Sequence, residues 1–172
     1  AEWVVLQFAT SKIGAILVNI NPAYRLHELE YALTQSGCTA IVIAPEFKTS
    51  NYTQMMYDLA PELYTANPGQ LQAERLPDLK MVIRLGNDPK AGMWLWRDLM
   101  VMAEQVSREA LAACQNQLEF DDPINIQYTS GTTGYPKGAT LSHHNILNNG
   151  YFVGEIMKLT EKDRLIIPVP LY

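Results

Sequence analysis

The sequence is poor in cysteine, in positive charge and in long apolar runs. It has only two cysteines, Cys38 and Cys114, which lie far apart and form no metal-ligand spacing, so we expect reduced thiols. A formal net charge of -5 gives no general attraction to nucleic acid or to anionic lipid. The longest apolar runs fall well short of the roughly 18 residues that a membrane span needs. These absences argue against a nucleic-acid-binding protein and a transmembrane segment, and they require that any bound phosphate be held by a local group of residues.

The composition is that of a globular protein, with 48% hydrophobic and 18% charged residues, enough apolar material to form a core. Apolar spacing alternates between helix-like and strand-like along the chain, which favours an α/β fold with a parallel sheet flanked by helices. The predicted helices cover residues 3–13, 26–36, 51–63 and 99–113 and a segment behind Ser142, and the predicted strands cover residues 15–20, 39–44, 79–85 and 124–129.

Three further predictions concern a glycine, a polar segment and a pair of tryptophans. Gly37 stands where a helix would end in a left-handed residue. The polar segment 63–77, which contains Pro68-Gly69, reads as a surface loop. Trp94 and Trp96 are spaced to lie on one face of a short strand.

Both ends of the chain suggest a part of a larger fold. The first residue is not methionine and a helical pattern is already under way, while the last residues, Ile166–Tyr172, follow directly on an apolar run. We therefore expect a domain truncated at both ends, with no signal peptide visible. We also expect the isolated chain to be inactive and unstable. Cooperative thermal unfolding of the isolated chain, with no binding of a dye that detects exposed apolar surface, would refute this expectation.

The segment after the last predicted strand carries the chemistry. Ile124, Ile126 and Tyr128 alternate with polar residues, as in a strand with one buried face. The next ten residues contain four Ser or Thr hydroxyls, three glycines and a lysine. Glycines allow backbone amides to approach an anion, successive amides form an anion-binding concavity, and hydroxyls and a lysine add donors. We predict a phosphate-binding loop formed by Thr129, Ser130, Gly131, Thr132, Thr133, Gly134, Pro136, Lys137 and Gly138.

Three similar motifs do not fit this segment. The ATPase phosphate loop needs glycine before the lysine and Ser or Thr after it, whereas Pro136 and Gly138 flank Lys137. The three glycines are not spaced as in the dinucleotide fingerprint. Ser130 lacks the glycines two residues to either side that a hydrolase nucleophile elbow requires. The alternative of an ordinary Ser/Thr/Gly-rich turn is disfavoured because the segment leaves a buried strand and ends in Pro-Lys-Gly.

Residues Ile126–Lys137 resemble, position by position, the signature of the adenylate-forming superfamily, which includes acyl-CoA synthetases, luciferases and the adenylation domains of peptide synthetases. Residues Gly14–Pro22, followed by Glu28-Leu29, resemble the acyl-CoA synthetase branch. Residues Pro170–Tyr172 resemble the start of a motif that continues into a histidine. Asp122–Gln127 and Gly138–His143 resemble the medium-chain fatty acyl-CoA synthetases.

This resemblance implies that residues 1–172 are part of the large N-terminal, AMP-binding domain, with the C-terminal subdomain absent. It implies that the full enzyme uses ATP and Mg²⁺ to convert a carboxylate, such as a medium-chain fatty acid, into an acyl-adenylate and pyrophosphate, and that coenzyme A then displaces AMP. The loop would hold the β- and γ-phosphates, with Lys137 offsetting charge on the leaving group. No catalytic residue and no metal ligand is expected within this chain. The cytoplasm is the expected location, with the mitochondrial matrix as the alternative.

Two alternatives stay open: a non-catalytic nucleotide-binding module, and an adenylate-forming enzyme for aryl or amino acids. The paired histidines His143 and His144 are neighbours in sequence and do not share a helix face. We therefore interpret them as the start of a helix capped by Ser142 rather than as a metal site.

Overall fold

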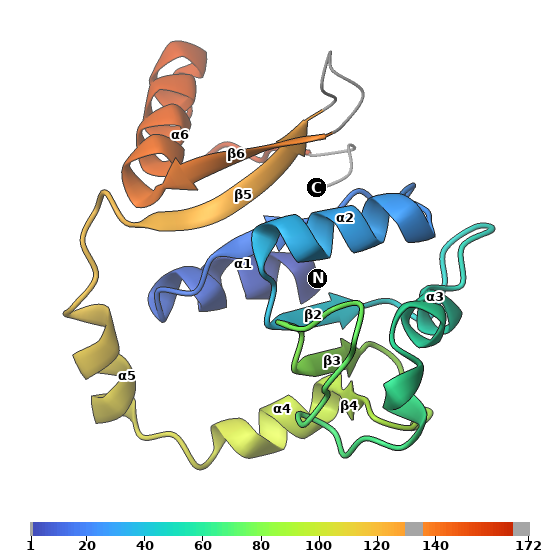
Figure 1. The fold of residues 1–172 in the computed structure, drawn as a ribbon. Coiled ribbons are helices and arrows are strands. Elements are labelled where there is room, and N and C mark those ends of the chain that lie inside the picture. Colours follow the sequence, from blue (N-terminus) through green and yellow to red (C-terminus); the bar gives the residue numbers. More distant parts are fainter. Residues whose placement is uncertain (1, 130–135, 167–172) are drawn as a thin grey trace. The chain divides into compact units, whose positions relative to one another are not determined.

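The computed structural model describes residues 2–129 and 136–166. The chain forms two compact units, residues 1–19 with 108–172, and residues 20–107. Each unit combines helices with a three-stranded sheet (Figure 1). The α/β prediction is therefore confirmed.

The first unit is built around a sheet with the order β1-β5-β6. Strand β1 (Leu17–Asn19) is parallel to β5 (Pro123–Thr129), as the predicted parallel sheet requires. Strand β6 (Lys137–Ser142) runs antiparallel to β5 and was not predicted, because its residues Lys-Gly-Ala-Thr-Leu-Ser carry no clear apolar alternation. The helices of this unit are α1 (Glu2–Lys12), α5 (Arg108–Gln115) and α6 (His143–Met157).

Two asparagines are buried in this sheet. Asn19 on β1 and Asn125 on β5 are 6% and 1% exposed. The indole nitrogen of Trp3 donates to Asn19 Oδ1 at 2.9 Å, and Asn125 Nδ2 donates to Gln7 Oε1 at 3.0 Å. The expectation that β5 buries only the Ile124 face is wrong at this position, because helix α1 covers the Asn125 face as well.

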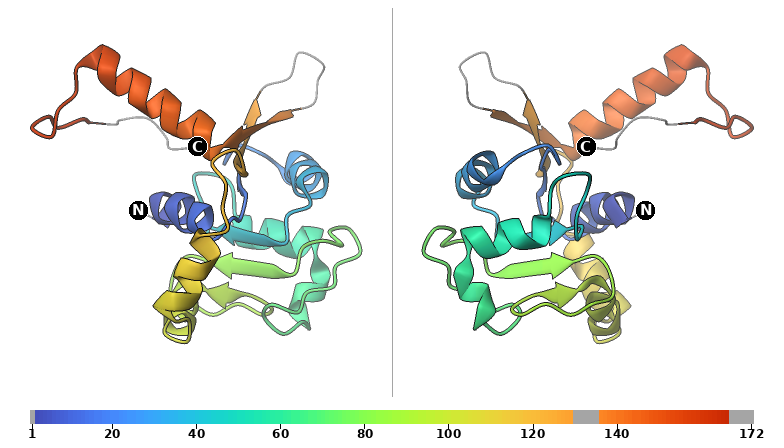
Figure 2. Two further views of the ribbon diagram at one scale, coloured as in Figure 1. Left: turned by 90° about the vertical axis from the view of Figure 1, so that its left-hand side faces the viewer. Right: turned by 90° about the vertical axis from the view of Figure 1, so that its right-hand side faces the viewer.

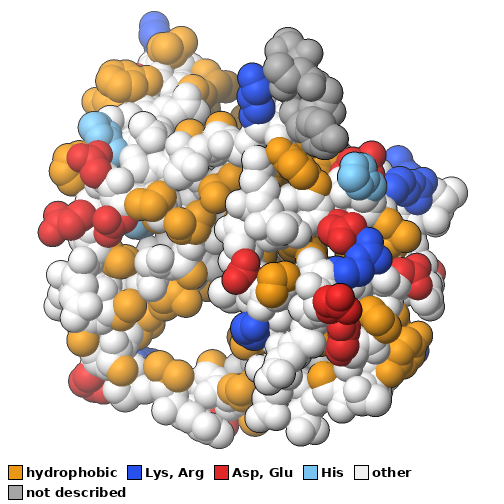
Figure 3. Space-filling model, in the orientation of Figure 1, with side chains coloured by type: hydrophobic (Ala, Val, Ile, Leu, Met, Phe, Trp, Pro, Cys, Tyr) orange, Lys and Arg blue, Asp and Glu red, His pale blue; other side chains and the backbone are white. Residues whose placement is uncertain are grey.

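Helix α6 begins at its predicted cap. The Ser142 hydroxyl accepts from the Asn145 amide at 3.3 Å, and Asn145 Oδ1 accepts from the Ser142 amide at 2.9 Å. The helix ends at Lys158, which is left-handed with φ 55°. Figure 2 shows the helix leading away from the β5–β6 hairpin, and none of its residues is buried. Hydrophobic side chains gather over it in Figure 3, and its exposed apolar residues are Ile146, Leu147, Tyr151, Phe152, Val153, Ile156 and Met157.

Because of this cap, replacing Ser142 by alanine is expected to lower the free energy of unfolding of the full-length protein by about 1 kcal/mol. The Asn145 amide would lose its acceptor. Urea unfolding followed by circular dichroism measures the change. Ser142→Asp keeps an acceptor at the cap and is the matched control, so equal losses in the two variants would contradict the capping role.

The second unit has a fully parallel sheet of order β2-β3-β4. Its strands are β2 (Ala40–Ile43), β3 (Met81–Arg84) and β4 (Trp94–Leu95). The helices are α2 (Leu26–Ser36), α3 (Tyr52–Leu59) and α4 (Trp96–Ala103), with a 3₁₀ turn η1 (Pro61–Tyr64) after α3. Gly37 ends α2 with φ 63° and donates its amide back to the last turn, so the predicted left-handed cap is confirmed.

The core of this unit lies between the sheet, α2, α3 and the segment after η1. Side chains from α3, η1 and β3 are fully buried, including Met56, Leu59, Leu63 and Val82. The predicted loop 63–77 has no regular element after η1, but it is not a surface loop throughout. Besides Leu63, three of its apolar side chains are buried in the core: Leu71, Ala73 and Leu76.

Three predictions differ from the structure in the type of element or by several residues. The helix expected to reach Leu63 ends at Leu59, because Pro61 has no amide to continue the helix. The helix expected over 99–113 is two helices, α4 and α5, separated by residues 104–107. The prediction that Trp96 lies in a strand with Trp94 is wrong. Trp96 is the first residue of α4, and the Asp98 carboxylate accepts a hydrogen bond from the Leu95 amide at 2.9 Å at the start of this helix.

The last residue of β3 is a buried arginine, Arg84. The Arg84 side chain is 6% exposed, and its guanidinium donates to Thr53 Oγ1 at 2.9 Å and to Asp88 Oδ1 at 2.6 Å. The hydrogen bond from Arg84, with a second one from Lys90, lowers the pKa of Asp88 to about 2. These bonds attach the loop after β3 to helix α3.

Candidate functional site

The β5–β6 hairpin brings together the two ends of the predicted phosphate-binding loop. Thr129 is paired with Lys137 in the antiparallel register, and the Thr129 hydroxyl donates to the Lys137 carbonyl at 3.4 Å. Both residues are exposed, whereas Pro136 is half-buried. The other predicted loop residues, Ser130, Gly131, Thr132, Thr133 and Gly134, lie outside the described residues. The described part of the site is therefore its frame: Thr129, Pro136, Lys137 and Gly138.

Lys137 is the cationic residue of the described part of the candidate site. No ion pair joins its ammonium to a carboxylate within residues 2–129 and 136–166. Its strand position opposite Thr129 fixes its backbone, while a lysine side chain is a mobile point charge on a flexible stem. A mobile cation beside a Ser/Thr/Gly segment can follow a phosphate whose charge changes during a reaction.

Gly138 is needed for space rather than for a positive φ. It pairs with Tyr128, and its φ is not among the positive ones. A Cβ at this position would stand 2.9 Å from Ile126 Cγ2 and 3.7 Å from the Tyr128 ring. Glycine therefore lets β6 lie against the side chains of β5 directly beside Lys137.

The family resemblance predicts that the full-length protein binds ATP, and replacing Gly138 by alanine is expected to reduce that binding about 10-fold, because the new methyl group must displace Ile126 or shift the backbone of Lys137. Isothermal titration with ATP measures the loss. Gly150→Ala is the matched control, since no neighbouring atom of the described residues lies within 4 Å of a Cβ there. The steric account would be contradicted by unchanged affinity in Gly138→Ala.

The histidines after β6 take part in the capped helix start. His144 Nδ1 lies 3.4 Å from Asp121 Oδ1, and the His144 ring is tilted against Phe120 with centroids 5.0 Å apart. The interpretation of Ser142 as a helix cap is confirmed. Within the described part of the chain, no group of three or more His, Cys, Asp or Glu side chains is placed to hold a metal ion.

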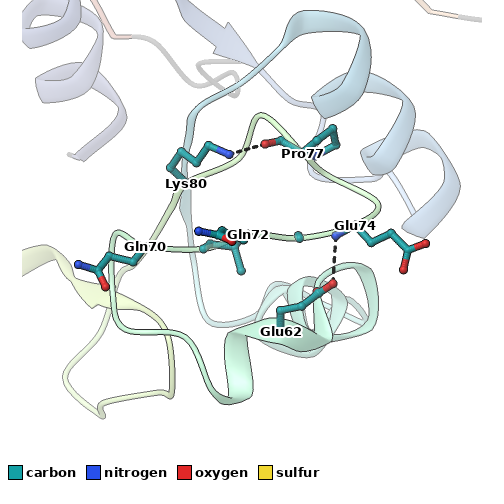
Figure 4. Close-up of a pocket in the computed structure, with 8 residues that line it drawn as sticks. Glu62, Gln70, Gln72, Glu74, Pro77 and Lys80 are labelled. Atoms are coloured by element: carbon teal, nitrogen blue, oxygen red, sulfur yellow. Dashed lines mark hydrogen bonds between the residues drawn. The ribbon is translucent and has the colours of Figure 1, made fainter.

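The second unit has two open hollows. The larger, about 720 Å³, is lined by Glu62, Glu74 and Lys80 among others. Figure 4 shows Glu62 pointing to the Glu74 amide, a bond of 3.0 Å, and Lys80 pointing to the Pro77 carbonyl. With two carboxylates and a lysine that is already engaged, this hollow is a poor anion site.

The smaller hollow, about 380 Å³, is lined by Arg84 and Lys90. The apolar pattern of β3 predicts a buried strand but gives no sign that Arg84, at its end, would be buried. Both cations pair with Asp88.

None of the described helices is long and apolar enough to cross a membrane.

Curated proteins similar to this chain are acyl-CoA synthetases and ligases. The chain is 46% identical to the putative acyl-CoA synthetase YngI of Bacillus subtilis, over 100% of this chain and 31% of that protein. It is 49% and 48% identical to the mitochondrial medium-chain acyl-CoA ligases ACSF2 of Danio rerio and Homo sapiens, each over 99% of this chain and 28% of that protein. The chain therefore spans less than a third of the length of these relatives.

The fold of this chain is similar to that of several solved structures. The N-terminal domain of FACL13 from Mycobacterium tuberculosis matches 99% of this chain and 35% of its own, with a TM-score of 0.65 and 20% identity. A putative long-chain-fatty-acid CoA ligase from Rhodopseudomonas palustris matches 95% of this chain and 34% of its own, with a TM-score of 0.67 and 20% identity. An ATP-bound RpMatB-BxBclM chimera matches 99% and 28%, with a TM-score of 0.60 and 25% identity.

A family model described as AMP-binding enzyme matches residues 1–172. The sequence signature, the α/β fold and the relatives agree with this match. The chain belongs to the AMP-binding enzyme family.

Proposed function

We propose that the full-length protein that contains this chain is an ATP-dependent acyl-CoA ligase. Its carboxylate substrate attacks the α-phosphorus of ATP, which gives acyl-adenylate and releases pyrophosphate, and the thiolate of coenzyme A then displaces AMP to form the thioester. The observation that carries this proposal is the β5–β6 hairpin, which holds Lys137 opposite Thr129 at the two ends of the Ser/Thr/Gly segment. Membership of the AMP-binding enzyme family and the names of the relatives support it.

Within this reaction the chain binds the part of ATP that leaves. Amides and hydroxyls of Thr129–Gly134 donate to the β- and γ-phosphates, and the Lys137 ammonium stabilises the negative charge that develops on pyrophosphate. Pro136 and Gly138 set the backbone on either side of Lys137. Magnesium would add charge neutralisation on the same phosphates, and we expect its ligands outside this chain. An ATP-bound structure among the neighbours of this fold is consistent with the assignment.

We propose a medium-chain fatty acid as the substrate, because the ACSF2 relatives are named medium-chain acyl-CoA ligases. The same names describe mitochondrial proteins, whereas the name of the Bacillus relative gives no compartment. We keep the cytoplasm as the predicted location and the mitochondrial matrix as the alternative, which fractionation of the source cells decides.

ATP–pyrophosphate exchange by the full-length protein tests the substrate class. Octanoate, palmitate, benzoate and a mixture of amino acids are supplied separately with radiolabelled pyrophosphate. We expect the fastest exchange with octanoate. Exchange with benzoate or amino acids alone would keep adenylate formation but reject the fatty acyl substrate.

A further inference from the structure

Helix α1 lies on the β1–β5 sheet with no buried residue of its own. Of its apolar side chains, Val4, Val5 and Phe8 are 38%, 50% and 65% exposed, and Trp3 and Leu6 are half-buried. Apolar packing is non-directional and here it is slight, so it does little to fix where along the strands this helix sits. Its position must come from directional contacts.

Two side-chain hydrogen bonds supply that direction. Trp3 and Gln7 are one helical turn apart and so lie on one face of α1. On the sheet, Leu17 is paired with Asn125, and Asn19 lies two residues further along β1, so both asparagines belong to one face. The hydrogen bonds Trp3–Asn19 and Gln7–Asn125 therefore form only when the first turns of α1 lie directly over these two asparagines of β1 and β5.

These bonds add little net stability. Asn19 Nδ2 and Asn125 Oδ1 are buried and have no hydrogen-bond partner among the described residues. The Trp3 indole can only donate, which fixes the orientation of the Asn19 amide and leaves its Nδ2 without a partner. The penalty for a buried polar atom without a partner is at least as large as the net gain from a neutral hydrogen bond. What the asparagines contribute is a defined register of helix on sheet.

We propose that Asn125 and Gln7 are positioning residues for the phosphate-binding loop, an inference that rests on the proposed function. Asn125 lies on β5 four residues before Thr129, where the loop begins. Holding Asn125 against α1 fixes β5 along its axis and thereby fixes the end from which Thr129 and its partner Lys137 present the loop. Misplacement of a binding group by about 1 Å can cost on the order of 100-fold in rate.

The test compares variants of the full-length protein by thermal unfolding and by ATP–pyrophosphate exchange with octanoate. Gln7→Leu with Asn125→Leu removes both polar groups at similar volume. We expect a melting temperature close to that of the wild type, because a polar pair is exchanged for an apolar one, but a roughly 10-fold lower kcat/KM for ATP. The swapped pair Gln7→Asn with Asn125→Gln keeps an amide bond of the same total length and should regain most of that loss. Ser11→Ala, which removes a hydroxyl that donates to the Phe8 carbonyl of the same helix, is the control.

A double leucine variant with wild-type kcat/KM for ATP would overturn the inference and leave the proposed function standing. If the wild type neither exchanges pyrophosphate nor binds ATP, the proposed function fails and the inference fails with it. If the double leucine variant does not fold, Gln7→Ala takes its place. A loss of kcat/KM for ATP in that variant, with the melting temperature still above the assay temperature, supports the inference, and an unchanged kcat/KM overturns it.

Discussion

Replacing Lys137 by alanine is expected to slow ATP–pyrophosphate exchange by the full-length protein about 100- to 1000-fold, the usual effect of removing one donor that stabilises charge in a transition state. Lys137 is exposed and is the first residue of β6, paired with Thr129 at the end of β5. Within the described residues it has no carboxylate partner. Because the charge on the leaving pyrophosphate grows during the reaction, the loss should fall more on kcat than on the KM for ATP.

Two further lysine variants separate this role from a general effect of charge. Lys137→Arg keeps the charge but changes its shape, and should retain part of the activity. Lys162→Ala removes an exposed lysine of the same unit outside the hairpin and should leave exchange unchanged. Equal activity in Lys137→Ala and Lys162→Ala would show that Lys137 does not act on the phosphates.

Replacing Gly92 by alanine should unfold or severely destabilise the second unit, by about 4 kcal/mol or more. Gly92 has φ 71°, which alanine adopts at a cost, and an added Cβ would stand 2.3 Å from the Leu63 carbonyl oxygen. That oxygen belongs to backbone, and the Leu63 side chain is fully buried in the core. Neither side can move without disturbing η1 or the loop before β4.

The matched control for this substitution is Gly69→Ala. Gly69 also has a positive φ, 82°, but its nearest neighbour would be the Trp94 side chain at 3.1 Å, which can rotate away. We expect a loss of about 1–2 kcal/mol there, from the backbone conformation alone. Urea unfolding of the full-length variants measures both losses. Similar values for the two glycines would mean that the clash with Leu63 is relieved.

The sequence predicted the elements that local residues determine. Gly37 ends α2 in a left-handed conformation and Ser142 caps α6, since each depends on a few neighbouring atoms. The apolar runs of β2 and β3 identify two strands that pair in parallel. Thr129 and Lys137 are singled out by the sequence as part of a phosphate-binding loop, a role that stays a prediction, whereas their pairing across a hairpin was not predicted.

What the sequence did not predict depends on contacts between distant segments. Strand β6 forms because β5 offers it a hydrogen-bonding edge. The burial of Asn125 follows from helix α1, more than 100 residues earlier, covering that face of β5. The burial of Arg84 depends on acceptors from α3 and from the loop that follows β3. In each case the deciding partner lies outside the window in which apolar spacing is read.

The most direct test of the account is detection of the adenylate itself. The full-length protein is mixed with ATP, Mg²⁺ and octanoate without coenzyme A, and the quenched mixture is examined by mass spectrometry. We predict octanoyl-AMP and pyrophosphate in equal amounts, up to one equivalent per active site, and their loss in Lys137→Ala. ATP binding with neither product, for octanoate or any other acid of the panel, would contradict the ligase and indicate a non-catalytic nucleotide-binding protein.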